Sequence, residues 1–153
     1  MNILVAAIEV GSVRVILPVC IELIKSGDNL IIEKKGHFLI ESVKELAPSL
    51  ATLPEDDASL KKFILDHKIN KVLFSVNVHD SRPLKIARIA DILNIDTIHV
   101  LDYWNGYRSR MELDGLNMFI PSVYLVPDDF ALHKAIEEGI PSQIIKVAGH
   151  PAL

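Results

Sequence analysis

Short, continuous runs of aliphatic residues recur along the chain and alternate with segments whose apolar residues are spaced for one face of a helix. Such runs are typical of parallel strands that are covered on both faces, because these strands lose the alternation of a half-exposed strand. Six runs are expected to be strands: Ile3–Ile8, Asn29–Glu33, Lys71–Val76, Thr97–Leu101, Ser122–Val126 and Ile144–Val147. Helical stripes separate them at Ser12–Lys25, 38–46, 58–66, 82–93 and 129–138.

This alternation predicts an α/β fold, a single doubly wound parallel sheet with right-handed crossovers and helices on both faces. We place Ile3–Ile8 at the centre and expect the Rossmann-like strand order 3-2-1-4-5-6 or an extension of it. Residues 51–53 are interpreted as a short extra strand. Since a domain has on the order of 150 residues, the 153 residues are expected to form one Rossmann-like domain, 1–153.

Composition narrows the classes of partner. Half of the residues are hydrophobic and only 6% aromatic, which indicates an aliphatic core, and the net charge of −4 leaves no basic surplus for nucleic acid. Every apolar stretch is shorter than the roughly 20 residues of a membrane-spanning helix, so we expect no membrane span. One cysteine, Cys20, and no secretory signal favour a cytoplasmic location.

Gly11 and Ser12 follow the first expected strand and open the first expected helix. The free backbone N–H groups of a helix N-terminus can hold a phosphate or carboxylate, so an anion is expected against Gly11–Val13, with Arg14 or Arg108 as a second contact. The alternative is structural, a tight turn at Gly11 and a helix cap at Ser12. Neither a Gly-x-Gly-x-x-Gly fingerprint nor a Walker loop is present, and we expect no cofactor.

A second polar cluster follows the Lys71–Val76 strand. Asn77, His79 and Asp80 combine a proton acceptor that works near neutral pH with a carboxylate, as general acid–base chemistry requires. Alternatively, Asp80 or Ser81 only caps the next helix and His79 is a solvated loop residue. The six histidines are scattered and lack cysteine companions, so no metal site is expected.

The long connection from Asp102 to Pro121 holds the only tryptophan and a concentration of aromatic and basic residues. Trp104, Tyr107 and Arg108 suit a sugar ring or a phosphate, because aromatic faces cover apolar sugar faces and guanidinium groups bind oxyanions in pairs of hydrogen bonds. Alternatively, Asp102 pairs with Arg108 or Arg110 while the aromatic rings plug the end of the sheet. Both readings stay open.

These three segments are expected to meet. In open parallel sheets, ligands bind at the carboxyl ends of the strands, where the strand order reverses. If the strands Ile3–Ile8, Lys71–Val76 and Thr97–Leu101 are neighbours, the loops that follow them share one crevice. We therefore predict a ligand site there, made by these residues: Gly11, Ser12, Arg14, Asn77, His79, Asp80, Asp102, Trp104, Tyr107 and Arg108.

Four segments taken together resemble a known family: Glu-Val-Gly-Ser-Val-Arg-Val-Ile-Leu-Pro-Val at 9–19, Leu-Asp-Tyr-Trp-Asn-Gly-Tyr-Arg at 101–108, Tyr-Leu-Val-Pro-Asp-Asp-Phe-Ala at 124–131, and Val-Ala-Gly-His-Pro-Ala-Leu at 147–153. They are similar to the N-terminal Rossmann-like domain of glycosyltransferases of the GT-B fold. Related members include lipid A disaccharide synthase and UDP-N-acetylglucosamine 2-epimerases. The first loop departs from many members, which have paired glycines there.

The resemblance implies an acceptor-side half domain in bacterial glycan or polysaccharide biosynthesis, in which a Gly-His-Pro element leads to a second domain that binds the nucleotide-sugar donor. It implies that Gly11, Ser12 and Arg14, together with 77–81 and 102–108, face the cleft. It also implies that a nucleotide sugar or glycan acceptor is the partner. The chain alone is then expected to be inactive, and to form a homodimer or a complex with a donor-binding chain. The alternative is a non-catalytic ligand-binding or interaction module on a flavodoxin-like sheet.

Overall fold

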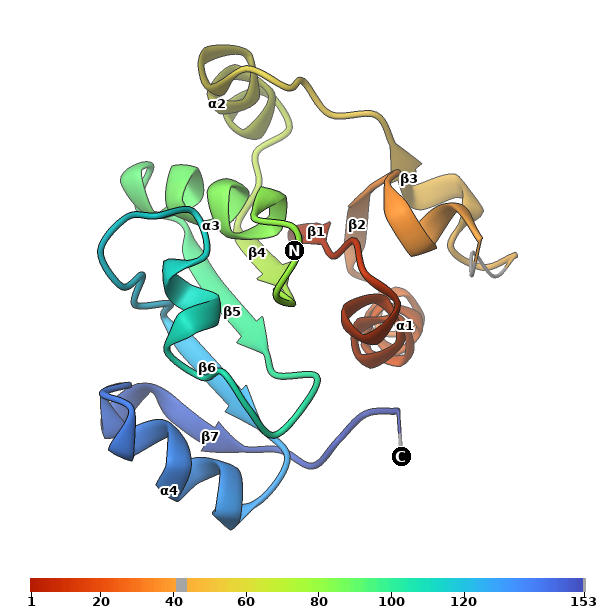
Figure 1. Cartoon of the computed structure of the whole chain (residues 1–153). Helices are drawn as coiled ribbons and strands as arrows, with labels where there is room; N and C mark the ends of the chain where they lie inside the picture. Colours follow the sequence, from red (N-terminus) through yellow and green to blue (C-terminus); the bar gives the residue numbers. More distant parts are fainter. Residues whose placement is uncertain (41–43, 153) are drawn as a thin grey trace.

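The computed structural model describes residues 1–40 and 44–152 and contains one all-parallel sheet with seven strands in the described residues, in the order β3-β2-β1-β4-β5-β6-β7 (Figure 1). The predicted fold class and the central position of the first strand are confirmed, and so is the extended strand order. The strands are β1 (Asn2–Ala6), β2 (Asn29–Glu33), β3 (Leu50–Ala51), β4 (Lys71–Phe74), β5 (Asp96–Val100), β6 (Val123–Val126) and β7 (Ile145–Val147).

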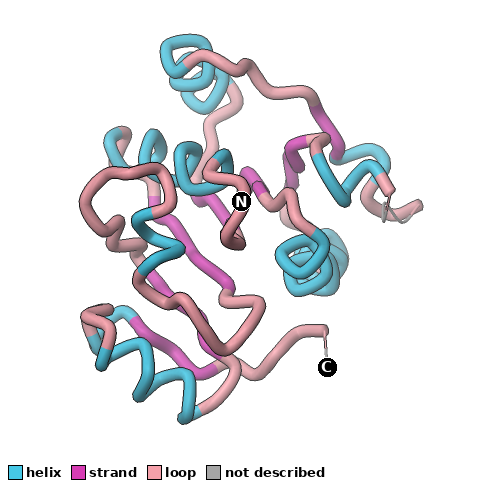
Figure 2. Tube along the Cα trace, viewed as in Figure 1, coloured by secondary structure: helices cyan, strands magenta, loops and turns pink. Residues whose placement is uncertain are grey.

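Helices cover the two faces of the sheet unequally (Figures 1 and 2). The helices are α1 (Val10–Lys25), α2 (Asp57–Asp66), α3 (Arg82–Ile92) and α4 (Asp129–Glu137), with short 3-10 helices at Gly36–Leu39, Ala47–Ser49, Ser109–Glu112 and Ser142–Ile144. α2, α3 and α4 pack on one face and α1 on the other. Each face therefore has its own core, which is centred on α3 on one side and on α1 on the other.

The helix ends match only some of the sequence signals. Asp128 caps α4, since its Oδ1 accepts the N–H of Ala131 at 2.9 Å. Ser12, which the structural alternative offered as a helix cap, does not cap α1, and of the two candidates at α3, Asp80 and Ser81, the structure selects Asp80. α1 begins at Val10, so Ser12 lies inside its first turn, and Ser81 makes no capping hydrogen bond. The residue before it, Asp80, accepts the N–H of Arg82 at 2.9 Å and performs that role at α3.

The helix predicted over 38–46 is also wrong where the structure describes it; residues 41–43 lie outside the described residues. Gly36–Leu39 forms a 3-10 helix and residues 44–46 form a turn. The N–H of His37 donates to the carbonyl of Ile8 at 2.9 Å, which ties this segment to the end of β1. Gly36, at φ +56°, packs so closely on Ile8 that a side chain there would overlap the same carbonyl. A local tertiary contact thus overrides the helical spacing.

A buried histidine makes the fold sensitive to pH. His99 lies on β5 between Phe74 and Tyr124, and its Nε2 accepts the N–H of Val76 at 3.3 Å. Burial, with a smaller contribution from the Arg110 cation, lowers the pKa of His99 to about 3. The ring is therefore neutral in the folded protein at all ordinary pH values.

Because the unfolded chain takes up this proton near pH 6.5 and the folded chain does not, stability must fall as the pH drops from 6.5 towards 3. We expect His99 to contribute a loss of about 2 kcal/mol between pH 7 and pH 5. Urea unfolding at both pH values measures it. His99→Gln should lose this part of the pH dependence, whereas His133→Gln, on the exposed side of α4, should keep it. Equal pH dependence in His99→Gln and the wild type would contradict the assignment.

Candidate functional site

The loops after β1, β4 and β5 meet at the carboxyl edge of the sheet. β4 pairs with β1 on one side and with β5 on the other, so the neighbourhood of these three strands is as predicted. Asn77 Nδ2 donates to Asp102 Oδ2 at 3.0 Å, which joins the second loop to the third. A Cβ placed on Gly11 would lie 2.8 Å from the same Asp102 oxygen, so the first loop touches both. Gly11, Asn77 and Asp102 therefore form the centre of the site.

Arg110 fixes the position of Asp102. The two side chains form an ion pair at 2.5 Å between Nη1 and Oδ1, and each side chain is only 2% exposed. Arg110 also donates to the carbonyl of Val76 at 2.7 Å and to both the carbonyl and side-chain oxygens of Asn105. One guanidinium thus connects the end of β4, the end of β5 and the following loop. Of the two arginines left open by the sequence, Arg110 is the partner of Asp102.

Arg108 lies elsewhere. Its side chain pairs with Glu112 at 2.8 Å, and its backbone N–H donates to Glu138 at 3.1 Å. Its guanidinium also lies beside Gly139, just past the end of α4. That end of α4 is opposite to Asp128, the residue that begins the helix near the site. The structure therefore does not bring Arg108 together with Gly11 and Asp102.

Two aromatic residues of the same loop have different roles. Trp104 donates from Nε1 to Asp128 at 2.8 Å and stacks on His150 with ring centroids 5.7 Å apart. Tyr107 is only 2% exposed, and its carbonyl accepts the hydroxyl of Tyr124 at 3.1 Å. The buried Tyr107 therefore packs at the end of the sheet, as the structural alternative for this loop expected. Trp104 instead lies at the carboxyl edge, beside Asp128 and His150.

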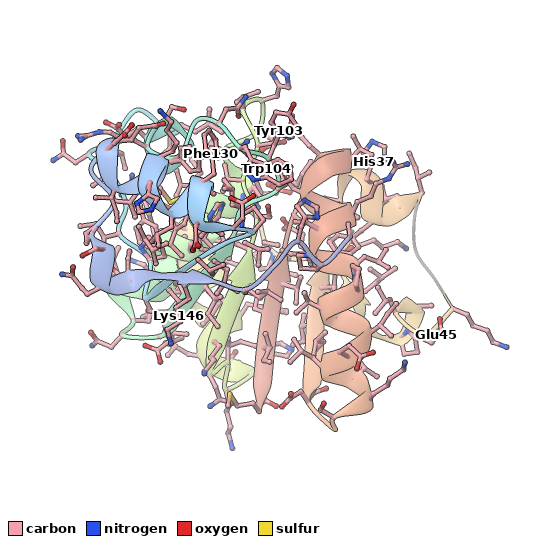
Figure 3. The ribbon with its side chains drawn as sticks, turned by 90° about the horizontal axis from the view of Figure 1, so that it is seen from below. His37, Glu45, Tyr103, Trp104, Phe130 and Lys146 are labelled. Atoms are coloured by element: carbon pink, nitrogen blue, oxygen red, sulfur yellow. The ribbon has the colours of Figure 1, made fainter. Side chains whose placement is uncertain are left out.

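The sequence did not single out Tyr103, which directly follows Asp102 and is 59% exposed. Its ring meets Trp104 edge to face at 5.8 Å, and Figure 3 shows both on one edge of the molecule with Phe130. His150 was named only within the closing motif, yet its Nε2 lies 3.1 Å from the carbonyl of Asp102. A flanking aromatic next to the acid was a usable signal for Tyr103; no local pattern points to His150.

The N-terminal turn of α1 already has negative charge beside it. The Asp102 carboxylate lies against Gly11, and the N–H of Val13 is used by the carbonyl of Glu9 at 2.9 Å. Glu9 adds a second carboxylate, which accepts the N–H of His79 at 3.4 Å. A further anion at this turn would meet the Glu9 carboxylate, whereas the charge of Asp102 is balanced by Arg110. The anion expected at this turn stays a prediction.

The remaining predicted residues lie around this centre. Ser12 is buried, and its hydroxyl has no hydrogen-bond partner among the described residues. Arg14 and His79 are exposed, while Asp80 is occupied as the cap of α3. Within 1–40 and 44–152, no three acidic, histidine or cysteine side chains gather to hold a metal ion. In the same residues, no helix has the length and apolar character needed to cross a membrane.

Solved structures show the same architecture over nearly the whole chain. UDP-N-acetylglucosamine 2-epimerase from Rickettsia bellii matches 99% of this chain with a TM-score of 0.66 and 16% identity. The matched part is 45% of the length of that enzyme. A putative UDP-N-acetylglucosamine 2-epimerase from Listeria monocytogenes matches 99% of this chain with a TM-score of 0.66 and 12% identity. The matched part is 46% of the length of that protein. HepE of Anabaena, solved with UDP-glucose, matches 98% of this chain with a TM-score of 0.63 and 13% identity. The matched part is 44% of the length of HepE.

No protein-family model matches the chain, and no curated protein matches it either. At identities this low, the structural matches establish the fold. The resemblance to the N-terminal Rossmann-like domain of the GT-B fold is confirmed at this level. The chain spans less than half the length of these solved structures.

Proposed function

We propose that this chain is the acceptor-side domain of a nucleotide-sugar enzyme of GT-B type, which works in the cytoplasm in bacterial glycan or polysaccharide biosynthesis. The observation that carries the proposal is the meeting of Gly11, Asn77 and Asp102 at the switch point of the sheet. The structural neighbours support it, because they include UDP-sugar epimerases and a protein solved with UDP-glucose. A second, donor-binding domain would face this edge.

The site offers groups that suit a sugar. Asn77 donates one amide hydrogen to the buried Asp102 carboxylate, and its half-buried amide retains one further N–H for a hydroxyl group of a ligand. Tyr103 exposes a ring beside them, and the C–H face of a sugar packs well on such a ring. The ligand group that this edge would bind is thus a neutral, hydroxylated ring, with the nucleotide held by the second domain.

A specific observation also favours the non-catalytic alternative. Arg110 neutralises Asp102 in a buried ion pair, and Asp80 caps α3, so two carboxylates of the predicted ligand site have structural roles. In the proposed enzyme, the reacting base would then come from His79, Glu9 or the second domain. In the alternative, the edge would bind a sugar without turnover.

We expect the isolated chain to bind UDP-glucose weakly at this edge without hydrolysing it or transferring the sugar. Asn77→Ala and Tyr103→Ala should each weaken binding about fivefold to tenfold, because each removes one contact worth on the order of 1 kcal/mol. Leu65→Ala is a matched control, since this side chain is similarly exposed but lies near the end of α2, which leads into the amino end of β4. Isothermal titration measures the affinities.

Turnover of UDP-glucose by the chain alone would contradict the need for a second domain. Equal affinity in the wild type, Asn77→Ala and Tyr103→Ala would contradict the site.

A further inference from the structure

A groove runs along the outer side of α3. Its volume is about 380 Å³, and it lies between the first turn of α2 and the residues Asp114 and Leu116 of the long connection after β5, which passes beside α3 (Figure 1). Sites for small molecules commonly have about 300–1,000 Å³ and combine apolar side chains with a few polar groups. The groove has this size and this mixed lining, and none of its residues belongs to the site at the carboxyl edge.

The apolar part of the groove lies towards the end of α3. Ile89 is 6% exposed and forms the buried part of the lining, whereas Ile92 and Leu116 are 67% and 59% exposed. Exposed apolar side chains that gather at one groove are typical of a binding surface. A ligand with an apolar group can cover all three side chains at once.

Arg88 is fixed in the wall of the groove. Its Nε and Nη2 donate to the Asp114 carboxylate at 2.5 and 3.1 Å, and Nη2 also donates to the carbonyls of Met111 and Asn117 at 3.2 and 2.6 Å. The charges of Arg88 and Asp114 therefore offset each other. Within 1–40 and 44–152, Nη1 makes no hydrogen bond, so its two N–H groups remain available on a guanidinium that is already held in place.

Lys85 and Asp57 carry the charges that remain. Lys85 lies one turn before Ile89 on α3, and Asp57 lies in the first turn of α2, close enough to Arg82 at the start of α3 for their charges to interact. Both side chains are exposed and line the groove, and neither forms an ion pair with another described residue. A purely anionic ligand would be repelled by Asp57 and a purely cationic one by Lys85. A ligand with both charges satisfies both residues.

We propose that this groove binds an apolar α-amino acid in its zwitterionic form. The carboxylate of the amino acid accepts hydrogen bonds from Lys85 Nζ and Arg88 Nη1, and its ammonium donates to the carboxylate of Asp57. Its side chain covers the apolar part of the groove. The charged head group thus lies near the start of α3 and the side chain near the end. The proposal uses no residue of the carboxyl edge and is independent of the proposed function.

Isothermal titration with L-leucine and L-phenylalanine tests the site. We expect at least one of them to bind at millimolar concentration. Three compounds each lack one part of leucine: 4-methylpentanoate lacks the ammonium, isoamylamine the carboxylate and glycine the side chain. Each should bind about tenfold more weakly than leucine or worse, because it loses a charge-assisted hydrogen bond or the apolar contact. Absence of binding by both amino acids, or binding of 4-methylpentanoate or isoamylamine as tight as that of leucine, overturns the proposal.

Variants assign the contacts. Lys85→Met should reduce the preference for leucine over isoamylamine about tenfold, and Asp57→Asn should do the same for leucine over 4-methylpentanoate, because each removes the charge that distinguishes the two compounds. Ile92→Ser should weaken leucine binding about fivefold. Ile136→Ser is the matched control, since Ile136 is 42% exposed near the end of α4, outside the groove. Circular dichroism checks that each variant is folded. Unchanged preferences in folded Lys85→Met and Asp57→Asn would contradict the proposed head-group contacts.

Discussion

Replacing Arg110 with methionine is expected to lower the free energy of unfolding by about 3–5 kcal/mol, since it leaves the buried Asp102 carboxylate without its cation. The loss also removes the donors that hold the carbonyl of Val76 and the loop at Asn105. Arg108→Ala is the matched control. Arg108 is half exposed and pairs with Glu112 on the surface, so its loss should cost less than about 1 kcal/mol.

Urea unfolding of both variants at pH 7 measures the difference. Similar, small losses for the two arginines would mean that Asp102 is not held by Arg110, and the account of the site would lose its structural basis. In ligand titrations, Arg108→Ala should bind as the wild type does, because the structure places its guanidinium beside the end of α4 rather than in the crevice.

Gly36→Ala is expected to destabilise the chain by about 3 kcal/mol. Its backbone is at φ +56°, which costs about 1 kcal/mol for any side chain, and a Cβ would overlap the Ile8 carbonyl and lie 2.7 Å from Ile8 Cγ2. Gly115→Ala separates the two causes. Gly115 has φ +79°, but nothing lies within 4 Å of its Cβ position, so only the backbone strain of about 1 kcal/mol should appear.

Thermal or urea unfolding of the two alanine variants measures this comparison. Equal losses of unfolding free energy in the two variants would show that the end of β1 can move to make room for a side chain at residue 36. The close packing of Gly36–Leu39 on the end of β1 would then be wrong.

The sheet could be predicted from the sequence because its strands are interior and parallel. The run Ile3–Ile8 is aliphatic without alternation, and this pattern predicts both a strand and the burial of that strand on both faces. Because crossovers between parallel strands are right-handed and the connections are short, only a few strand orders are then possible. The extra strand expected at 51–53 exists as Leu50–Ala51, one residue earlier and shorter than the run of small and apolar residues indicated.

The choice of individual side chains within the site could not be predicted in the same way. Which of Arg108 and Arg110 pairs with Asp102 depends on the 3-10 turn at Ser109–Glu112, which directs the two side chains in different directions. Tyr107 and Tyr103 lie four residues apart in one loop, yet Tyr107 is buried and Tyr103 is exposed. His150 reaches Asp102 from the end of the described chain through tertiary structure alone.

The central claim is that the carboxyl edge around Asn77, Asp102 and Tyr103 binds the sugar part of a nucleotide sugar. Backbone amide shifts in an isotope-labelled sample, followed during titration with UDP-glucose and separately with UDP, test it most directly. The account predicts that UDP-glucose moves the amides of 9–12, 77–80 and 102–105, and that UDP alone moves them much less. Shifts confined to other parts of the chain, or equal shifts with UDP, would contradict it.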